Sequence, residues 1–284
     1  MRQIANRSLA ANLILLLGTL WVVPARAQNI AVPSASDTAV PHTPLRTHAN
    51  AASPTAAEII ERMLPRNQER LATLERYESE RTYRVEYTGT GGEHHAEVHV
   101  HAEYMAPDQK RLTVVSKSGS KLLYEKVLRR LVESEQEATA QSTRMQMTLG
   151  PKNYDVELLG EETLPMPDGP IRTWILRVTP KVINKFTYRG SIWVSEDDYA
   201  LVKIQGEPAK NPSWWINRAK FESTYLRRGH LWLPSKITSS SHVRIGGEAT
   251  LTIEYGAYPV LLERTPRAIV ESAQNPSSAV ALGR

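Results

Sequence analysis

The sequence predicts an α+β protein that is mainly an antiparallel β-sheet. From residue 154 to residue 258, successive segments alternate apolar and polar residues, which is the two-residue period of half-buried strands. Turn-like connections such as Glu196-Asp197-Asp198 and Gly246-Gly247 separate them, and short connections join antiparallel neighbours. Helical periodicity is confined to two segments, near residues 54–77 and 121–137.

Residues 1–27 have the layout of a secretory signal peptide. Arg2 and Arg7 form a basic start, residues 9–23 are apolar, and Ala25-Arg26-Ala27 is a small-residue cleavage site. The apolar run is shorter than the roughly 20 residues that span a membrane. We therefore predict cleavage after Ala27 and a periplasmic location; an uncleaved N-terminal anchor is the alternative.

Composition excludes several classes of function. The chain has no cysteine, so it has no disulfide, no thiolate nucleophile and no cysteine for lipoprotein acylation. Loss of Arg2, Arg7 and Arg26 with the leader lowers the net charge from +5 to +2. No dense basic tract remains, so we expect no nucleic acid partner. No Gly-rich strand-to-helix loop is present, which excludes a parallel nucleotide-binding sheet.

The chain divides into four parts. After the signal peptide, residues 28–53 are rich in Ala, Pro, Ser and Thr and read as a flexible linker. Residues 54–260 carry the periodic patterns and form one predicted domain. Residues 261–284 contain Pro266 and Asn275-Pro276-Ser277-Ser278 and are predicted to be a flexible tail.

The domain is predicted to begin with a helix. Ser53 is a possible N-cap, and Pro54 suits the first helical position. Apolar residues then recur at helical spacing: Ile59, Ile60, Met63, Leu64, Leu71, Leu74 and Tyr77. Pro65 interrupts this stripe, so the pattern indicates either one kinked helix or two short ones.

A hairpin and a second helix are predicted next. Glu80–Thr88 and His94–Tyr104 alternate around a Gly-rich turn, and Arg111–Lys117 is a third strand. Lys121–Glu137 then places five apolar residues on one helical face: Leu123, Val127, Leu128, Leu131 and Val132. Residues 138–149 either extend this helix or form a loop.

The second half is predicted to be almost entirely strand. The predicted strands are Tyr154–Gly160, Arg172–Thr179, Tyr188–Ser195, Ala200–Gly206, Ile216–Leu226, Leu231–Ile245 and Glu248–Tyr258. One face is apolar along successive strands, as in Ile192 and Val194, and the other face is polar. Such a sheet must curve over something, and two short helices cover only part of it, which indicates a cavity.

Five stretches carry a family resemblance. They are Tyr188–Pro208, Asn211-Pro-Ser-Trp-Trp215, His230-Leu-Trp-Leu-Pro-Ser235, Val243-Arg-Ile-Gly-Gly247 and Leu251-Thr-Ile-Glu-Tyr255. Together they resemble exported bacterial proteins of the outer-membrane lipoprotein-sorting (LolA-like) group. The resemblance implies a curved, incomplete β-barrel with helices covering its concave face, and binding of lipid or lipoprotein acyl chains.

From this resemblance and the apolar face we expect a lipid- or lipoprotein-binding carrier without catalysis or cofactor. The alternative is a sensor module of the same fold that detects lipidated or misfolded envelope proteins and signals to an inner- or outer-membrane protein. Ten residues are candidates for lining the cavity: Trp174, Leu176, Val178, Ile192, Val194, Val202, Ile204, Leu251, Ile253 and Tyr255. Trp214 and Trp215 are candidates for its mouth or for a membrane contact.

A histidine-rich strand offers a third reading. In an extended chain His95, Glu97, His99 and His101 share one face, and two histidines at this spacing can bind one zinc ion. A site needs further ligands from another strand, and the sequence shows none. We therefore predict no metal, and a metal-dependent enzyme is the least favoured alternative. No Gly-x-Ser-x-Gly or His-Glu-x-x-His motif is present.

Overall fold

The computed structural model describes residues 53–107, 109–137, 148–184, 187–210, 216–244 and 246–264. The expected signal peptide, almost all of the linker, most of the tail, and Trp214 and Trp215 lie outside these residues. No helix in the described part of the chain is both long and apolar enough to cross a membrane.

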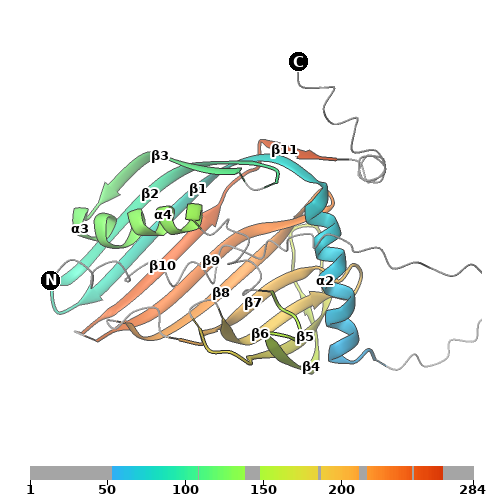
Figure 1. Cartoon of the computed structure of the whole chain (residues 1–284). Helices are drawn as coiled ribbons and strands as arrows, with labels where there is room; N and C mark the ends of the chain where they lie inside the picture. Colours follow the sequence, from blue (N-terminus) through green and yellow to red (C-terminus); the bar gives the residue numbers. More distant parts are fainter. Residues whose placement is uncertain are drawn as a thin grey trace, which may run out of the picture.

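The core of the fold is one eleven-stranded antiparallel sheet (Figure 1). Its order is β3-β2-β1-β10-β9-β8-β7-β6-β5-β4, with β11 also paired to β1. The strands are β1 Leu74–Gly89, β2 Gly92–Met105, β3 Gln109–Gly119, β4 Tyr154–Leu164, β5 Ile171–Pro180, β6 Tyr188–Ser195, β7 Leu201–Pro208, β8 Ile216–Arg228, β9 Leu231–Val243, β10 Glu248–Tyr255 and β11 Val260–Glu263. Strands β3 and β4 are the edges, so the sheet is open. The predicted fold class is confirmed.

Strand β1 joins the beginning of the domain to its end. Tyr83 of β1 pairs with Val98 of β2 on one side and with Ile253 of β10 on the other. Farther along, Tyr77 pairs with Leu261 of β11. Strand β11 was not predicted, and it carries the sheet to Glu263, within the segment expected to be a tail.

Helix α2 spans Ala56–Thr73 and runs without a break through Pro65. Its N-cap is Thr55, not Ser53: Glu58 N donates to Thr55 Oγ1 at 3.3 Å, and Thr55 N donates to Glu58 Oε2 at 2.8 Å. This reciprocal pair satisfies two backbone donors that a helix start leaves free, which Ser53 is too far upstream to do.

The prediction that Leu74 and Tyr77 continue this helix was wrong. Both residues lie in β1 and belong to a small apolar cluster with Tyr104, Leu231 and Leu233. The rings of Tyr77 and Tyr104 stack with centroids 5.3 Å apart across the β1–β2 pair. Packing against neighbouring strands therefore decided the conformation, because a short apolar spacing is compatible with either element.

A continuous helical segment follows β3, as predicted. It consists of α3 Lys121–Leu123, a π-helical turn η1 Tyr124–Leu128, and α4 Arg129–Glu137. Ser120 Oγ caps it by accepting a hydrogen bond from Leu123 N at 3.4 Å. Leu128, Leu131 and Val132 are buried and face the sheet.

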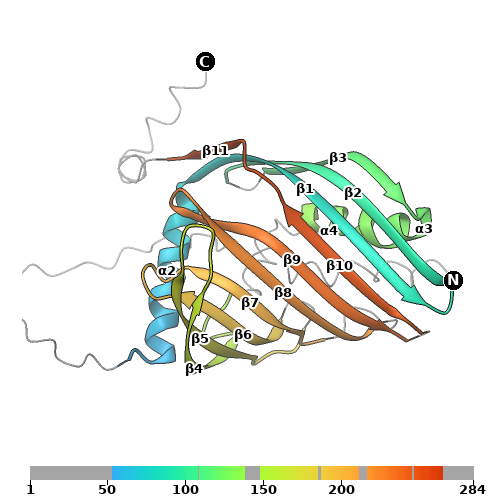
Figure 2. The same cartoon turned by 180° about the vertical axis from the view of Figure 1, so that it is seen from behind.

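Both helical segments lie on the same side of the sheet, which curves around them (Figure 1). Helix α2 crosses the end formed by β4 to β7, and α4 lies over β1 and β2 at the other end. Figure 2 shows the opposite side, where none of the described helices covers the strands. We call the helix side the concave face and the other side the outer face.

Candidate functional site

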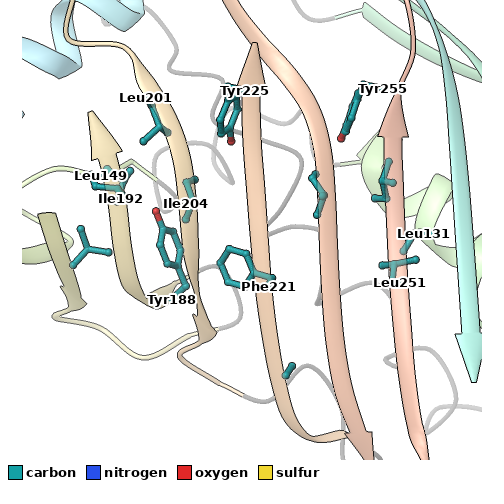
Figure 3. Packing of buried hydrophobic residues seen from close by; sticks show 14 of the residues in the cluster. Leu131, Leu149, Tyr188, Ile192, Leu201, Ile204, Phe221, Tyr225, Leu251 and Tyr255 are labelled. Atoms are coloured by element: carbon teal, nitrogen blue, oxygen red, sulfur yellow. The ribbon is translucent and has the colours of Figure 1, made fainter. Parts of the chain in front are cut away.

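The concave face is an apolar surface that extends over most of the sheet (Figure 3). All but one of the ten sequence candidates are buried in its central cluster: Trp174, Leu176, Val178, Ile192, Val194, Ile204, Leu251, Ile253 and Tyr255. Strands β5, β6, β7 and β10 therefore present the predicted residues to one side. Their role in ligand contact stays a prediction.

Val202 is buried but lies outside that cluster. Between β6 and β7, Trp193 pairs with Lys203 whereas Val194 pairs with Leu201, so Val202 is the extra residue of a β-bulge. Leu201 joins the central cluster instead. An inserted residue interrupts the strict alternation of a strand. Counting back by two from Ile204 therefore selects Val202, whereas the central cluster contains Leu201.

Sequence reasoning missed an aromatic part of the concave face. Tyr188, Phe221 and Tyr225 belong to the same cluster and face the same side of the sheet (Figure 3). The rings of Tyr188 and Phe221 pack edge to face with centroids 5.5 Å apart. Gly206, the partner of Phe221 on the intervening strand β7, has no side chain to separate them. The alternation of Ala219, Phe221, Ser223 and Tyr225 in the sequence was a usable signal.

Helix α2 is fixed over its end of the sheet by polar contacts to the β6–β7 turn. Arg62 Nη1 donates to the Tyr199 hydroxyl at 2.8 Å, and Asn67 Nδ2 donates to the Tyr199 carbonyl at 3.2 Å. The Arg66 guanidinium lies 4.6 Å from the centre of the Tyr199 ring. Tyr199 has a φ of 57°, in the left-handed region that residues other than glycine seldom adopt. We call these contacts, with those of Asp198 below, the α2 anchor.

Asp198 completes the α2 anchor. Its carboxylate lies 3.4 Å from Arg70 Nη2 and accepts a hydrogen bond from Trp232 Nε1 at 2.9 Å. Partial burial alone would raise the pKa of Asp198, but the Trp232 hydrogen bond and the Arg70 charge outweigh it and lower that pKa. The sequence suggested only a turn former here; the structure adds a contact that joins α2, this turn and β9.

A small pocket of about 50 Å³ lies between α2 and the concave face. Its lining includes Met63 and Leu71 from α2, and Leu201, Tyr225 and Trp232 from the sheet. Pockets that hold small molecules are typically about 300–1,000 Å³. In this conformation the space between α2 and the sheet is thus too small for a long-chain ligand.

The opposite helix is held by a buried charged network. Glu135 of α4 accepts hydrogen bonds from Lys110 Nζ at 2.6 Å, from Arg81 Nη1, and from the Tyr83 hydroxyl at 2.5 Å. The Arg81 guanidinium also lies 4.7 Å from the centre of the Tyr255 ring. Burial acts to raise the pKa of Glu135, but the two cations and the Tyr83 hydrogen bond outweigh it and lower that pKa to about 2.

The histidine strand is β2, and its polar residues lie on the outer face. His99 Nε2 is 2.9 Å from Glu97 Oε1, and its Nδ1 is 3.2 Å from Thr82 Oγ1. His101 Nδ1 is 2.6 Å from Glu80 Oε1, while His95 is exposed. Among the residues that the structure describes, no three His, Asp or Glu side chains are grouped closely enough to hold a metal ion.

No protein-family model matches the sequence, and no curated protein matches it. Among solved structures, the chain is similar to a LolA superfamily protein from Nitrosomonas europaea, with 12% identity and a TM-score of 0.33, covering 76% of this chain and 97% of that one. It is also similar to a putative outer-membrane lipoprotein-sorting protein domain from Vibrio parahaemolyticus, with 14% identity and a TM-score of 0.29, covering 72% and 94%.

A further similar structure is the Pseudomonas aeruginosa MucA/MucB complex, with 11% identity and a TM-score of 0.24, covering 72% of this chain and 94% of that one. The structural neighbours of this chain thus include LolA superfamily and lipoprotein-sorting proteins, the group that its sequence resembles.

Proposed function

We propose that this protein is an exported carrier that binds the acyl chains of a lipid or lipoprotein on its concave face, without a catalytic step. One observation carries the proposal: an open sheet presents a continuous apolar and aromatic face, and a helix covers one end of that face through contacts at its rim. Burial of an acyl chain there supplies affinity of about 0.8 kcal/mol per CH₂ group.

Helix α2 is the movable cover in this proposal. The side chains of Arg62 and Arg66 are exposed, and contacts of exposed charges are weak, so water can replace them at low cost. The buried contacts of α2 are made by Ile59, Ile60 and Met63. An acyl chain that takes their place restores the apolar contact that the sheet loses, and this offsets part of the cost of moving α2.

The leader of the chain gives the carrier its location. Cleavage after Ala27 would release a mature protein that begins at Gln28 on the periplasmic side of the inner membrane. N-terminal sequencing of protein recovered from the cell envelope tests this step. A membrane-bound product that retains Met1 would instead support the anchor alternative.

Native mass spectrometry of protein purified from the envelope tests the proposed function. We expect a fraction of the protein to carry additional mass that corresponds to lipid, and we expect that lipid to be displaced by a fluorescent alkyl probe. Protein that carries no lipid and binds no such probe would refute the proposal. A vesicle-to-vesicle transfer assay then separates the two readings, since a carrier accelerates transfer and a sensor binds without transferring.

A further inference from the structure

Three hydroxyl groups on the concave face are buried without a hydrogen-bond partner. They are Tyr188 Oη on β6, Ser223 Oγ on β8 and Ser239 Oγ on β9. Tyr188 is 5% exposed, Ser223 is 1% exposed and Ser239 is 2% exposed. A buried hydroxyl is normally hydrogen-bonded, because it loses its bonds to water on burial. Phe at the tyrosine position and Ala at the two serine positions would avoid that loss.

Ser239 lies in the middle of the apolar surface. Its Cα partners are Phe221 on β8 and Leu251 on β10, and both belong to the central cluster. Because paired residues of antiparallel strands share a face, the Ser239 side chain is directed into that cluster. The buried Ser223 lies diagonally across on β8, where it pairs with Ile237. This part of the face therefore contains hydroxyl groups between apolar side chains.

Tyr188 extends this polar element toward β6. Its ring packs edge to face against Phe221 (Figure 3), and Phe221 is the strand neighbour of Ser239. Tyr188 N donates to the Tyr154 hydroxyl at 3.3 Å, so Tyr154 has a partner while the Tyr188 hydroxyl has none. The unsatisfied groups are thus side-chain donors on the ligand-facing side.

The chemistry of these groups selects a neutral acceptor. Burial raises the pKa of Tyr188 well above its ordinary value, so its phenol stays protonated and can donate. The side chains that neighbour the three hydroxyl positions are uncharged: Ile204, Phe221, Ile237 and Leu251. A carboxylate placed among them would be unpaired and costly, whereas a carbonyl oxygen needs only one or two hydrogen-bond donors.

We propose that Tyr188, Ser223 and Ser239 form a polar subsite that binds the ester or amide carbonyls of an acylated ligand. This inference rests on the proposed function and narrows it, because it selects acyl esters and amides over hydrocarbon chains without a carbonyl. Lipid and lipoprotein both supply such a carbonyl, and the subsite recognises the feature that they share.

The test compares two matched competitors in the full-length mature protein. One is a diacylglycerol, and the other is the dialkyl ether of equal chain length, which lacks the carbonyls. Each displaces a pyrene-labelled alkane. We expect wild-type protein to prefer the ester by about tenfold, the value of one hydrogen bond near 1.4 kcal/mol. The triple variant Tyr188→Phe/Ser223→Ala/Ser239→Ala should lose this preference and keep its affinity for the ether.

Two controls test whether the loss of ester preference is specific to the subsite and whether the removed hydroxyls have a structural role. Ser240→Ala removes an exposed hydroxyl from the outer face of the same strand, and it should keep the ester preference. The melting temperature of the triple variant should not fall, since the three removed hydroxyls have no partner in the protein. A fall of several degrees would show a structural role and overturn the subsite.

The remaining outcomes distinguish the two proposals. If wild-type protein binds neither competitor nor probe, the carrier function itself fails. If wild type binds ester and ether equally, or the triple variant keeps the ester preference, the subsite is wrong while the carrier function stands. A diacylated lipopeptide in a third arm identifies the source, because a lipoprotein carrier should bind it more tightly than diacylglycerol.

Discussion

The phenol of Tyr83 on β1 donates a 2.5 Å hydrogen bond to the carboxylate of Glu135 on α4, and both side chains are fully buried. The same carboxylate accepts from Lys110 of β3, so one acidic group connects α4 to two strands. This fixed helix contrasts with α2, which is held over the sheet through partly exposed contacts at the β6–β7 turn. The two covers of the concave face therefore differ in how readily they can be displaced.

Replacing Glu135 with Gln should destabilise the protein strongly. The substitution leaves Arg81 and Lys110 as buried cations without a counter-charge, and breaking a buried ion pair costs about 3–5 kcal/mol. Urea unfolding measures the change. Glu133→Gln, an exposed residue on the same helix that pairs with Arg129, is the matched control and should change stability by less than about 0.5 kcal/mol. Equal effects of the two variants would contradict the role of the network.

Stability should fall in acid as Glu135 takes up a proton. Its pKa is lowered from 4.5 to about 2 in the folded protein, so the unfolded chain binds this proton first. The stability that ionised Glu135 contributes is fully present above the pKa of this group in the unfolded chain. It is lost as the pH falls through the pKa of the group in the folded protein. The difference between the two pKa values corresponds to about 3 kcal/mol of folding stability. Urea unfolding between roughly pH 5 and pH 2 should show a shallower decline for Glu135→Gln than for wild type; parallel declines would count against this assignment.

Weakening the α2 anchor should accelerate ligand uptake. The double variant Arg62→Gln/Arg66→Gln removes the hydrogen bond to the Tyr199 hydroxyl and the cation over its ring, both at exposed guanidinium groups. We expect a several-fold faster loading of a fluorescent alkyl probe in stopped-flow experiments and only a small loss of stability, because contacts of exposed charges are weak. Glu61→Gln, exposed on the same helix, should load at the wild-type rate. Unchanged loading in the double variant would argue that α2 is not the cover.

A charge on the concave face should abolish binding of the alkyl probe. Ile204→Asp places a carboxylate among Ile192, Tyr188 and Phe221, where ionisation is costly. Gln205→Asp puts the same charge on the outer face of the neighbouring position and should bind normally. Circular dichroism establishes that both variants are folded. Normal binding by a folded Ile204→Asp would show that this part of the face is ordinary core.

The outer-face histidines of β2 should not contribute a structural metal. His99 and His101 already contact Glu97 and Glu80, and a closed zinc site needs four ligands. A chelator should therefore leave the melting temperature unchanged. A drop of several degrees that zinc reverses would favour the metal-dependent alternative and direct attention to Glu97.

Local patterns predicted most of the sheet because its alternation is regular. Residues such as Ile192, Val194, Leu251 and Ile253 follow the two-residue period without interruption, and each lies where alternation places it. Prediction failed where the chain departs from the period. Val202 occupies a bulge whose position depends on the register between β6 and β7, and Leu74 follows packing with distant residues rather than its helical spacing.

The contacts that hold the helices on the sheet could not be predicted from local sequence patterns. Arg81 and Glu135 are 54 positions apart in sequence, and Arg62 and Tyr199 are 137 apart. Each of these residues looks like an ordinary surface or turn residue in its own segment. Their partners become visible only when the sheet order is known, because that order brings α4 over β1 and the β6–β7 turn beneath α2.

The pairing of β1 with β10 and β11 has a kinetic consequence. Strand β1 opens the sheet in sequence, yet its partners on one side are the last strands of the domain. The junction between β1 and β10 therefore cannot form until nearly the whole domain is available, and closing this non-local pair is slower than forming the hairpins between consecutive strands. Until β10 and β11 are available, β1 therefore lacks its neighbours on one side, and the β1–β2–β3 unit stays separate from the β4–β10 strands.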